Sequence, residues 1–327
     1  MDDRLKNPDI NRLLAAFAHR DADRVPNFEI TINGRGISHI LGIQTDQGLW
    51  QITPESSIKV VKGIGQDAIP CPLQFHLEQG SICNNDDFER MKKSVVYPDV
   101  KCKLESYLKA VKGTNIGVCP CLSGSLTAAY LAAGPVSIES FMIMIFEQPD
   151  LVGNLLDFYM EYTLNVIRQI KDLPFHFIYV GDDVTGFVGP DRLSELWAGR
   201  HERIIRAAKA TGKPVMCHCC GPMADVLPYF KKWEVDAIHP MQTNVNDIYQ
   251  IHRDYPGFAL VGNIDINLLS FGKKEEVVSD TKTHIDRLSD DNSYVVCSSH
   301  SIIDSVIPEN FLAMVETAWN SCGCASQ

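Results

Sequence analysis

The chain has 327 residues, of which 45% are hydrophobic and 22% charged, and its formal net charge is −11. These proportions indicate an ordinary globular protein, and the negative charge disfavours nucleic acid as a partner. No apolar run of about 18 residues occurs, so no membrane span is expected. The first six residues lack the apolar core of a signal peptide, and eleven cysteines in such a chain predict a reducing, cytoplasmic location.

The first half of the sequence predicts an irregular mixture of elements. Residues 7–20 have the apolar spacing of an amphipathic helix, and residues 24–30 predict a strand that ends in a carboxylate at Glu29. The further expected elements are a turn at 33–36, strand material around 68–76, a charged helix over 88–112, a strand over 115–121 and a long helical stretch over 137–171 with a break near Pro149.

The second half predicts a regular alternation of strands and helices. Strands are expected at 175–180, 213–220, 235–239, 258–262 and 293–297, and helices at 190–210, 223–233, 245–255, 274–290 and 309–320. Such alternation indicates a parallel sheet. Seven or eight units in this length favour a single α/β domain over residues 1–327, a closed (β/α)₈ TIM barrel with an N-terminal helical extension.

Polar side chains gather at the predicted C-terminal ends of the strands, where barrels of this kind place their active sites. They are Glu29, Asp182, Asp183, His218, Cys220, His239, Asn263, Cys297 and His300. Among them, we predict Asn263 to be the cofactor-binding residue.

The segment from Lys213 to Gly221 carries the clearest chemistry. Side chains alternate along a strand, so His218 and Cys220 share one face, while Cys217 and Cys219 point the other way as packing residues. An imidazole and a thiol two residues apart form half of a zinc site, and Cys297 at the end of a later strand is the predicted third ligand. The fourth position is left open for chemistry.

Several roles remain open between chemistry and structure. Asp182 and Asp183 either orient substrate and assist proton transfer or cap the following turn. His300 either donates to a bound anion or is a loop residue, and we include all three as catalytic candidates. Glu29 either reaches the metal as a fourth ligand or substrate contact, or merely ends its strand.

Several motifs together resemble the uroporphyrinogen decarboxylase superfamily, and within it the cobalamin-dependent methyltransferase branch. They are Arg24-Val-Pro26, Gly181-Asp-Asp183, His218-Cys-Cys-Gly221, Val261-Gly-Asn-Ile-Asp265, Cys297-Ser-Ser-His-Ser-Ile302 and Ile307-Pro-Glu-Asn310. The resemblance covers nearly the whole chain. In that branch a His-x-Cys pair and a distant cysteine hold zinc, which implies the same role for His218, Cys220 and Cys297.

The resemblance implies transfer of a methyl group between a corrinoid (cobalamin) protein and a small thiol, methoxylated or methylamine-type substrate. The cobalamin would be presented by the partner protein, since no cobalamin-binding helical domain is visible here. The methyl donor, the acceptor and the direction of transfer stay open, and so does the oligomeric state, with a homodimer as one option.

Two other functions compete with methyl transfer. A metal-independent decarboxylase of the same fold would act through Asp182 or Asp183. Porphyrinogen as its substrate is disfavoured, because only Arg35 remains where true decarboxylases carry an arginine-rich segment, and because the net charge of −11 suits a polycarboxylate poorly. A non-catalytic module that binds a corrinoid protein is the third hypothesis.

Overall fold

A computed structural model describes residues 6–183 and 185–321. Its strands are β1 (Ala68–Pro72), β2 (Gly117–Ser123), β3 (Ile178–Gly181), β4 (Val215–His218), β5 (Ala237–His239), β6 (Ala259–Val261) and β7 (Tyr294–Val295). They form one sheet in the order β1 to β7, and every neighbouring pair is parallel. The predicted parallel α/β architecture is therefore confirmed, with the strands near their expected positions.

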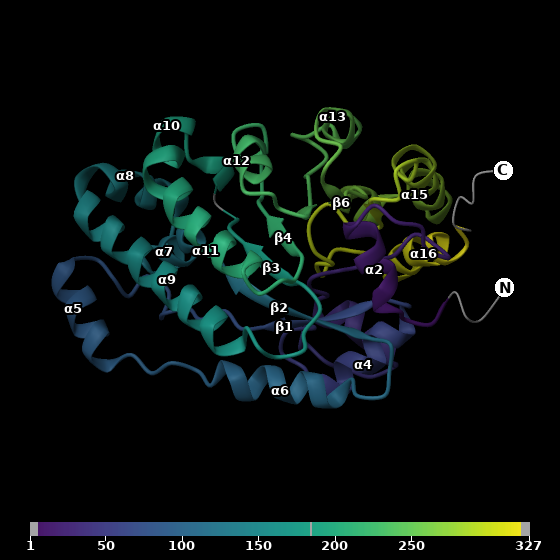
Figure 1. The fold of residues 1–327 in the computed structure, drawn as a ribbon, viewed down its shortest axis with the longest axis horizontal. Coiled ribbons are helices and arrows are strands. Elements are labelled where there is room, and N and C mark those ends of the chain that lie inside the picture. The colour runs from purple at the N-terminus through teal and green to yellow at the C-terminus, as the bar shows by residue number, and fades with distance from the viewer. Residues whose placement is uncertain (1–5, 184, 322–327) are drawn as a thin grey trace.

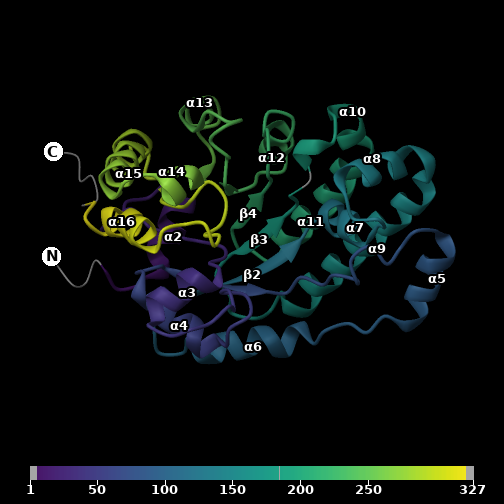
Figure 2. The ribbon, with the colours of Figure 1, turned by 180° about the vertical axis from the view of Figure 1, so that it is seen from behind.

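Helices connect and cover the strands (Figures 1 and 2). They are α2 (Ile10–Phe17), α3 (Gly34–Leu41), α4 (Pro54–Gly63), α5 (Asn85–Ser94), α6 (Val100–Ala110), α7 (Ser125–Ala132), α8 (Ile138–Glu147), α9 (Pro149–Ile170), α10 (Pro190–Arg192), α11 (Gly199–Lys209), α12 (Leu227–Lys232), α13 (Ile248–Asp254), α14 (Ile266–Phe271), α15 (Lys274–Leu288) and α16 (Pro308–Trp319), with a 3₁₀ turn η1 (Thr185–Phe187) and a π-helix η2 (Leu193–Ala198). None of the helices in the described part of the chain has the length and apolar character needed to cross a membrane.

Some predicted boundaries were wrong for identifiable reasons. The single helix expected over 88–112 is two helices, α5 and α6, because Pro98 disfavours helical backbone at the residue before it. The break near Pro149 is confirmed between α8 and α9. Helices α3, α7 and α14 were missed, since each has only six to eight residues, which is shorter than the window over which apolar periodicity identifies a helix.

The predicted first strand is an extended segment rather than a strand. The Phe28 N–H donates to the Val296 carbonyl at 3.1 Å, which joins this segment to the residues after β7. On its other side the contact with β1 runs through a side chain. Gln66 accepts from the Glu29 N–H at 2.8 Å and donates to the carbonyls of Glu29 and Ala68 at 3.1 and 2.8 Å. The sheet is thus seven-stranded and curled, and full closure into eight strands stays a prediction.

The inner face of the curled sheet holds a core separate from the layer between sheet and helices. Side chains from successive strands meet there, among them Cys119, Cys121, Phe177, Tyr179, Met216, Ala237, Val261, Val295 and Cys297. Helix α2 packs onto the N-terminal end of this core, where Phe17 meets Phe177 edge-on at 5.1 Å and Ile10 lies over Gly117. The C-terminal ends of the strands are left for the polar residues.

One fully buried carboxylate, Asp182, ties β3 to its surrounding helices. It accepts hydrogen bonds from the N–H groups of Leu126 and Thr127, at 3.3 and 2.6 Å, and from Trp197 Nε1 at 2.9 Å. The first two groups belong to the first turn of α7, whose free amides need an acceptor. Asp182 therefore anchors both α7 and η2 to the end of β3.

Replacing Asp182 with alanine should destabilise the protein by about 3 kcal/mol or more, because three buried donors would lose their acceptor. Urea denaturation followed by circular dichroism measures this loss. Asp172→Ala, at a side chain that is 86% exposed, is the matched control and should change stability by no more than about 0.5 kcal/mol. Equal midpoints for the two variants would contradict the anchoring role.

Candidate metal centre

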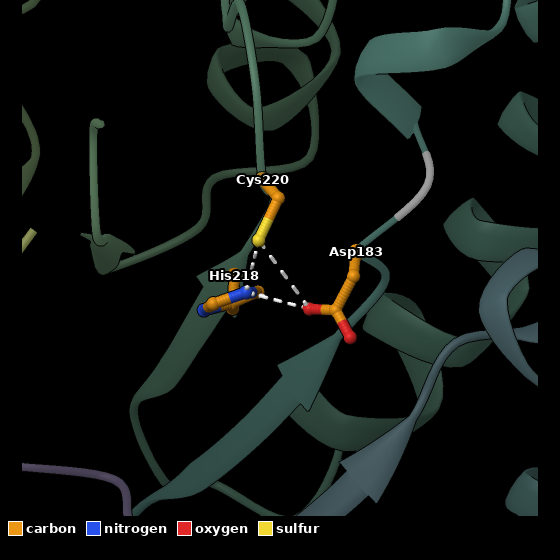
Figure 3. A group of neighbouring side chains, drawn as sticks. All are labelled: Asp183, His218 and Cys220. Atoms are coloured by element: carbon orange, nitrogen blue, oxygen red, sulfur yellow. Dashed lines mark hydrogen bonds and ion pairs between the residues drawn. The ribbon is translucent and has the colours of Figure 1, made fainter. Parts of the chain in front are cut away.

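Three side chains meet where β3 and β4 end (Figure 3). His218 Nε2 lies 2.6 Å from Asp183 Oδ1 and 3.3 Å from Cys220 Sγ, and the sulfur lies 3.8 Å from the same oxygen. One donor atom from each residue falls within 4.8 Å of the other two. The structure therefore brings together two of the three predicted metal ligands, with a carboxylate we had predicted as catalytic.

Strand alternation explains which side chains reach this point. On β4, Met216 joins the inner core together with Tyr179 of β3, whereas Cys217 and Cys219 lie buried on the helix-covered face. The predicted separation of the four residues is confirmed. The same alternation along β3 puts Asp182 on the outer face and Asp183 on the inner one.

Two glycines let the turns after β3 and β4 pack against each other. Gly221 has a φ of +82°, which side chains rarely tolerate, and a Cβ on Gly186 would lie 2.6 Å from the Cys220 carbonyl oxygen. The Gly221 N–H also donates to Gln242 Oε1 at 2.5 Å. These contacts fix the backbone of Cys220 beside the segment that carries Asp183.

His239, at the end of β5, orients the His218 ring through a contact between their Nδ1 atoms. The parallel register pairs the two residues, and their Nδ1 atoms are 2.6 Å apart in a buried position. Burial, then the neighbouring His218, holds the pKa of His239 well below its usual range, so it stays neutral and accepts. His218 must then carry a proton on Nδ1, which leaves Nε2 as the atom that faces Cys220 and Asp183.

The three groups shift one another's protonation. Burial alone would lower the pKa of His218, but Asp183 and Cys220 outweigh it and raise that pKa to about 10. Burial opposes ionisation of Cys220 as well, yet His218 and His300 lower the pKa of the thiol to about 7. Partial loss of solvent around Asp183 would raise its pKa, but His218 outweighs this effect and the pKa is lowered. Without metal, and at a pH between about 7 and about 10, the site therefore holds a protonated imidazole between two anionic groups.

Cys297 and Glu29 interact with each other on the inner face of the sheet, outside the group of three. Both are buried, and Cys297 lies in the inner core but outside the group whose donor atoms fall within 4.8 Å of one another. The two carboxylate oxygens of Glu29 accept from the Ser298 N–H and Oγ, at 2.7 and 2.9 Å. Burial raises the pKa of Glu29 to about 7, and burial together with Glu29 raises that of the Cys297 thiol.

Of the remaining predicted residues, His300 lies at the site, whereas Asp182 and Asn263 make hydrogen bonds that connect neighbouring segments of the fold. His300 contacts Cys220, whose thiol raises the pKa of the imidazole. Asp182 points away from the site, and this placement favours its capping role over proton transfer. Asn263 donates to the Met241 carbonyl at 2.5 Å and accepts from His284 Nε2 at 3.1 Å, so its side chain links β6 to neighbouring segments.

The donor set suits a metal ion such as zinc. Zinc binds imidazole nitrogen, thiolate sulfur and carboxylate oxygen, and these three kinds of atom converge here from three residues. A hydrogen bond to the second nitrogen of a ligating histidine, as His239 makes, is the usual support for such a ligand. The sequence identified His239 as a polar residue at a strand end but assigned it no partner. Its position at the end of the strand that follows the His218 strand was the feature that could have indicated the pairing.

Comparison with known proteins gives one family and one close architectural match. The family model for uroporphyrinogen decarboxylase (URO-D) matches residues 67–320. Among solved structures, a methyltransferase from Methanosarcina mazei aligns with a TM-score of 0.68 and 17% identity, over 95% of this chain and 98% of that chain. A D-psicose 3-epimerase from Clostridium cellulolyticum H10 aligns at a TM-score of 0.46 and 11% identity, over 83% and 91% of the two chains. No curated protein sequence matches the chain.

The pH dependence of Cys220 alkylation tests the lowered pKa of its thiol. In metal-free protein, the rate at which iodoacetamide alkylates Cys220 should rise with pH around a midpoint of about 7, because the thiolate is the nucleophile. Below that pH the thiol is protonated and the rate falls. Peptide mass spectrometry of quenched samples measures the rate. In His218→Ala the midpoint should move upward; an unchanged midpoint would show that His218 does not stabilise the thiolate.

Proposed function

Because this chain belongs to the uroporphyrinogen decarboxylase family, we propose that it is a zinc-dependent methyltransferase of that family, which exchanges a methyl group with a corrinoid protein. The observation that carries the proposal is the meeting of His218, Cys220 and Asp183 at the end of β3 and β4. The fold shared with the methyltransferase from M. mazei, over nearly the full length of both chains, supports it.

His218, Cys220 and Cys297 are the proposed zinc ligands. His218 Nε2 and Cys220 Sγ are already 3.3 Å apart, and Cys297 lies on the same inner face, two residues beyond the end of β7. Bound zinc would lower the pKa of a substrate thiol and keep it as a thiolate nucleophile. Two cysteine thiolates would bring the charge of the metal near zero, which suits a nucleophilic sulfur better than strong Lewis-acid catalysis.

The protein groups then have distinct tasks. His239 fixes the orientation of His218, and the buried Glu29 accepts hydrogen bonds from Ser298 beside Cys297. His300, next to Cys220, is placed to donate a hydrogen bond to sulfur or to an anionic substrate. Binding of the two reactants at the open end of the sheet would supply rate through proximity.

Decarboxylation of a porphyrinogen remains the weaker alternative. The arginine left in the relevant segment, Arg35, donates to the backbone carbonyl of Asp304 at 2.9 Å and lies exposed at the start of α3. It therefore does not form part of the group around His218. A metal-free decarboxylation would use Asp183 but assigns no role to the Cys220 thiol that lies beside it.

The purified protein should bind about one zinc per chain and transfer the methyl group of methylcobalamin to a small thiol. His218→Ala, Cys220→Ser and Cys297→Ser should each lower zinc content, because each removes a donor. Elemental analysis measures zinc, and the absorption change of methylcobalamin measures transfer. Carbon dioxide release that persists with a chelator would favour the decarboxylase, whereas binding of a corrinoid protein without turnover would favour the non-catalytic module.

His239→Phe should weaken zinc binding about 10–100-fold, since the ring nitrogen that orients His218 is lost. His239→Asn, which keeps a hydrogen-bond acceptor, should restore part of the affinity. Competition with a chromophoric chelator gives the affinity of each protein, and circular dichroism establishes that the variants are folded. Equal affinities for His239→Phe and the unaltered protein would exclude the orienting role.

A further inference from the structure

The identity of the fourth ligand at the proposed zinc site can be argued from the surrounding carboxylates. Glu29 was the sequence-based candidate, but both of its oxygens already accept hydrogen bonds from Ser298. Asp183 already lies close to two of the proposed ligands. Its Oδ1 lies 2.6 Å from the nitrogen of His218 and 3.8 Å from the sulfur of Cys220.

Asp183 also lies on the side from which a substrate must approach. Its side chain is 53% exposed, whereas that of His218 is only 6% exposed. Figure 3 shows the carboxylate on the segment that follows β3, His218 at the end of β4, and Cys220 on the coil that follows β4. The carboxylate thus stands between the two other donors and solvent, and it can move without disturbing the buried strand.

We propose that Asp183 is the fourth zinc ligand in the substrate-free protein, and that a thiol substrate displaces it. This inference rests on the proposed function. In the exchange the bond from Asp183 oxygen to zinc breaks, a bond from the substrate sulfur to zinc forms, and the thiol proton leaves to a base in solution. One anionic ligand would replace another, so the net charge of zinc and its four ligands would not change, and the released Asp183 carboxylate, which is 53% exposed, would be stabilised by solvent.

If Asp183 competes with the substrate for zinc, its removal should change the affinity for zinc and the affinity for thiol in opposite directions. Asp183→Asn should bind zinc about 10-fold more weakly without thiol, because one anionic donor is gone. The zinc-loaded variant should bind 2-mercaptoethanol about 10-fold more tightly than the unaltered protein, because no ligand has to be displaced. An Asp183 that only assists proton transfer would leave both affinities unchanged.

Cobalt-substituted protein separates ligation from a simple charge effect. Without thiol, the visible d–d bands of the cobalt protein should differ between Asp183→Asn and the unaltered chain, since the ligand set differs. With saturating 2-mercaptoethanol the two spectra should coincide, and the sulfur-to-cobalt charge-transfer absorbance should rise about 1.5-fold in the unaltered protein, from two thiolates to three. Asp191→Asn, at an exposed carboxylate in α10, is the matched control and should change neither spectrum.

The outcomes distinguish this inference from the function on which it rests. If neither zinc nor cobalt binds with His218 and Cys220 intact, the proposed function fails. If metal binds but Asp183→Asn has the same thiol-free spectrum as the unaltered protein, Asp183 is not a ligand and the inference is overturned. If the spectra differ but thiol affinity does not rise, Asp183 is a permanent ligand and its proposed displacement is overturned.

Discussion

The parallel register of β3, β4 and β5 is the constraint on which the site depends. It places Gly181, His218 and His239 side by side in one row at the C-terminal edge of the sheet. Gly181 leaves the space that the Tyr179 hydroxyl occupies, since a Cβ there would lie 2.6 Å from it. A shift of one residue between any two strands would turn one histidine to the helix-covered face. The position of the site is therefore set by the backbone hydrogen bonds that fix the register of these strands.

Adjacent aspartates show how the same residue type acquires two uses. Asp182, on the outer face, is surrounded by donors from α7 and η2 and holds them together. Asp183, one residue later, faces an imidazole and a thiol and stays half exposed. Both are ionisable, but of the two only Asp183 belongs to a group of side chains whose donor atoms could hold a metal ion. In the metal-free site those protons occupy positions that a cation would take, so metal binding must release them to solvent.

Local periodicity predicted much of this arrangement. It located all seven strands and separated His218 and Cys220 from Cys217 and Cys219, because alternation along a strand depends only on neighbouring residues. It would also have separated Asp182 from Asp183, had it been extended along β3. It could not show that His239 pairs with His218, that Ser298 holds Glu29, or that 24–30 is only an extended segment. Those facts depend on contacts between residues far apart in the chain.

Helix α2 determines from which end of the sheet the reactants can approach the site. Phe17 and Ile10 of α2 pack against the inner core and cover the N-terminal end of the sheet, opposite the polar residues. In the proposed methyl transfer, the small reactant and the corrinoid protein would therefore both approach from the C-terminal ends of the strands. A corrinoid protein bound at that end would block the exit of a small molecule already bound at the site. Under the proposed function the small molecule would then bind before the partner and its product would leave after the partner, so the order of binding would follow from the architecture.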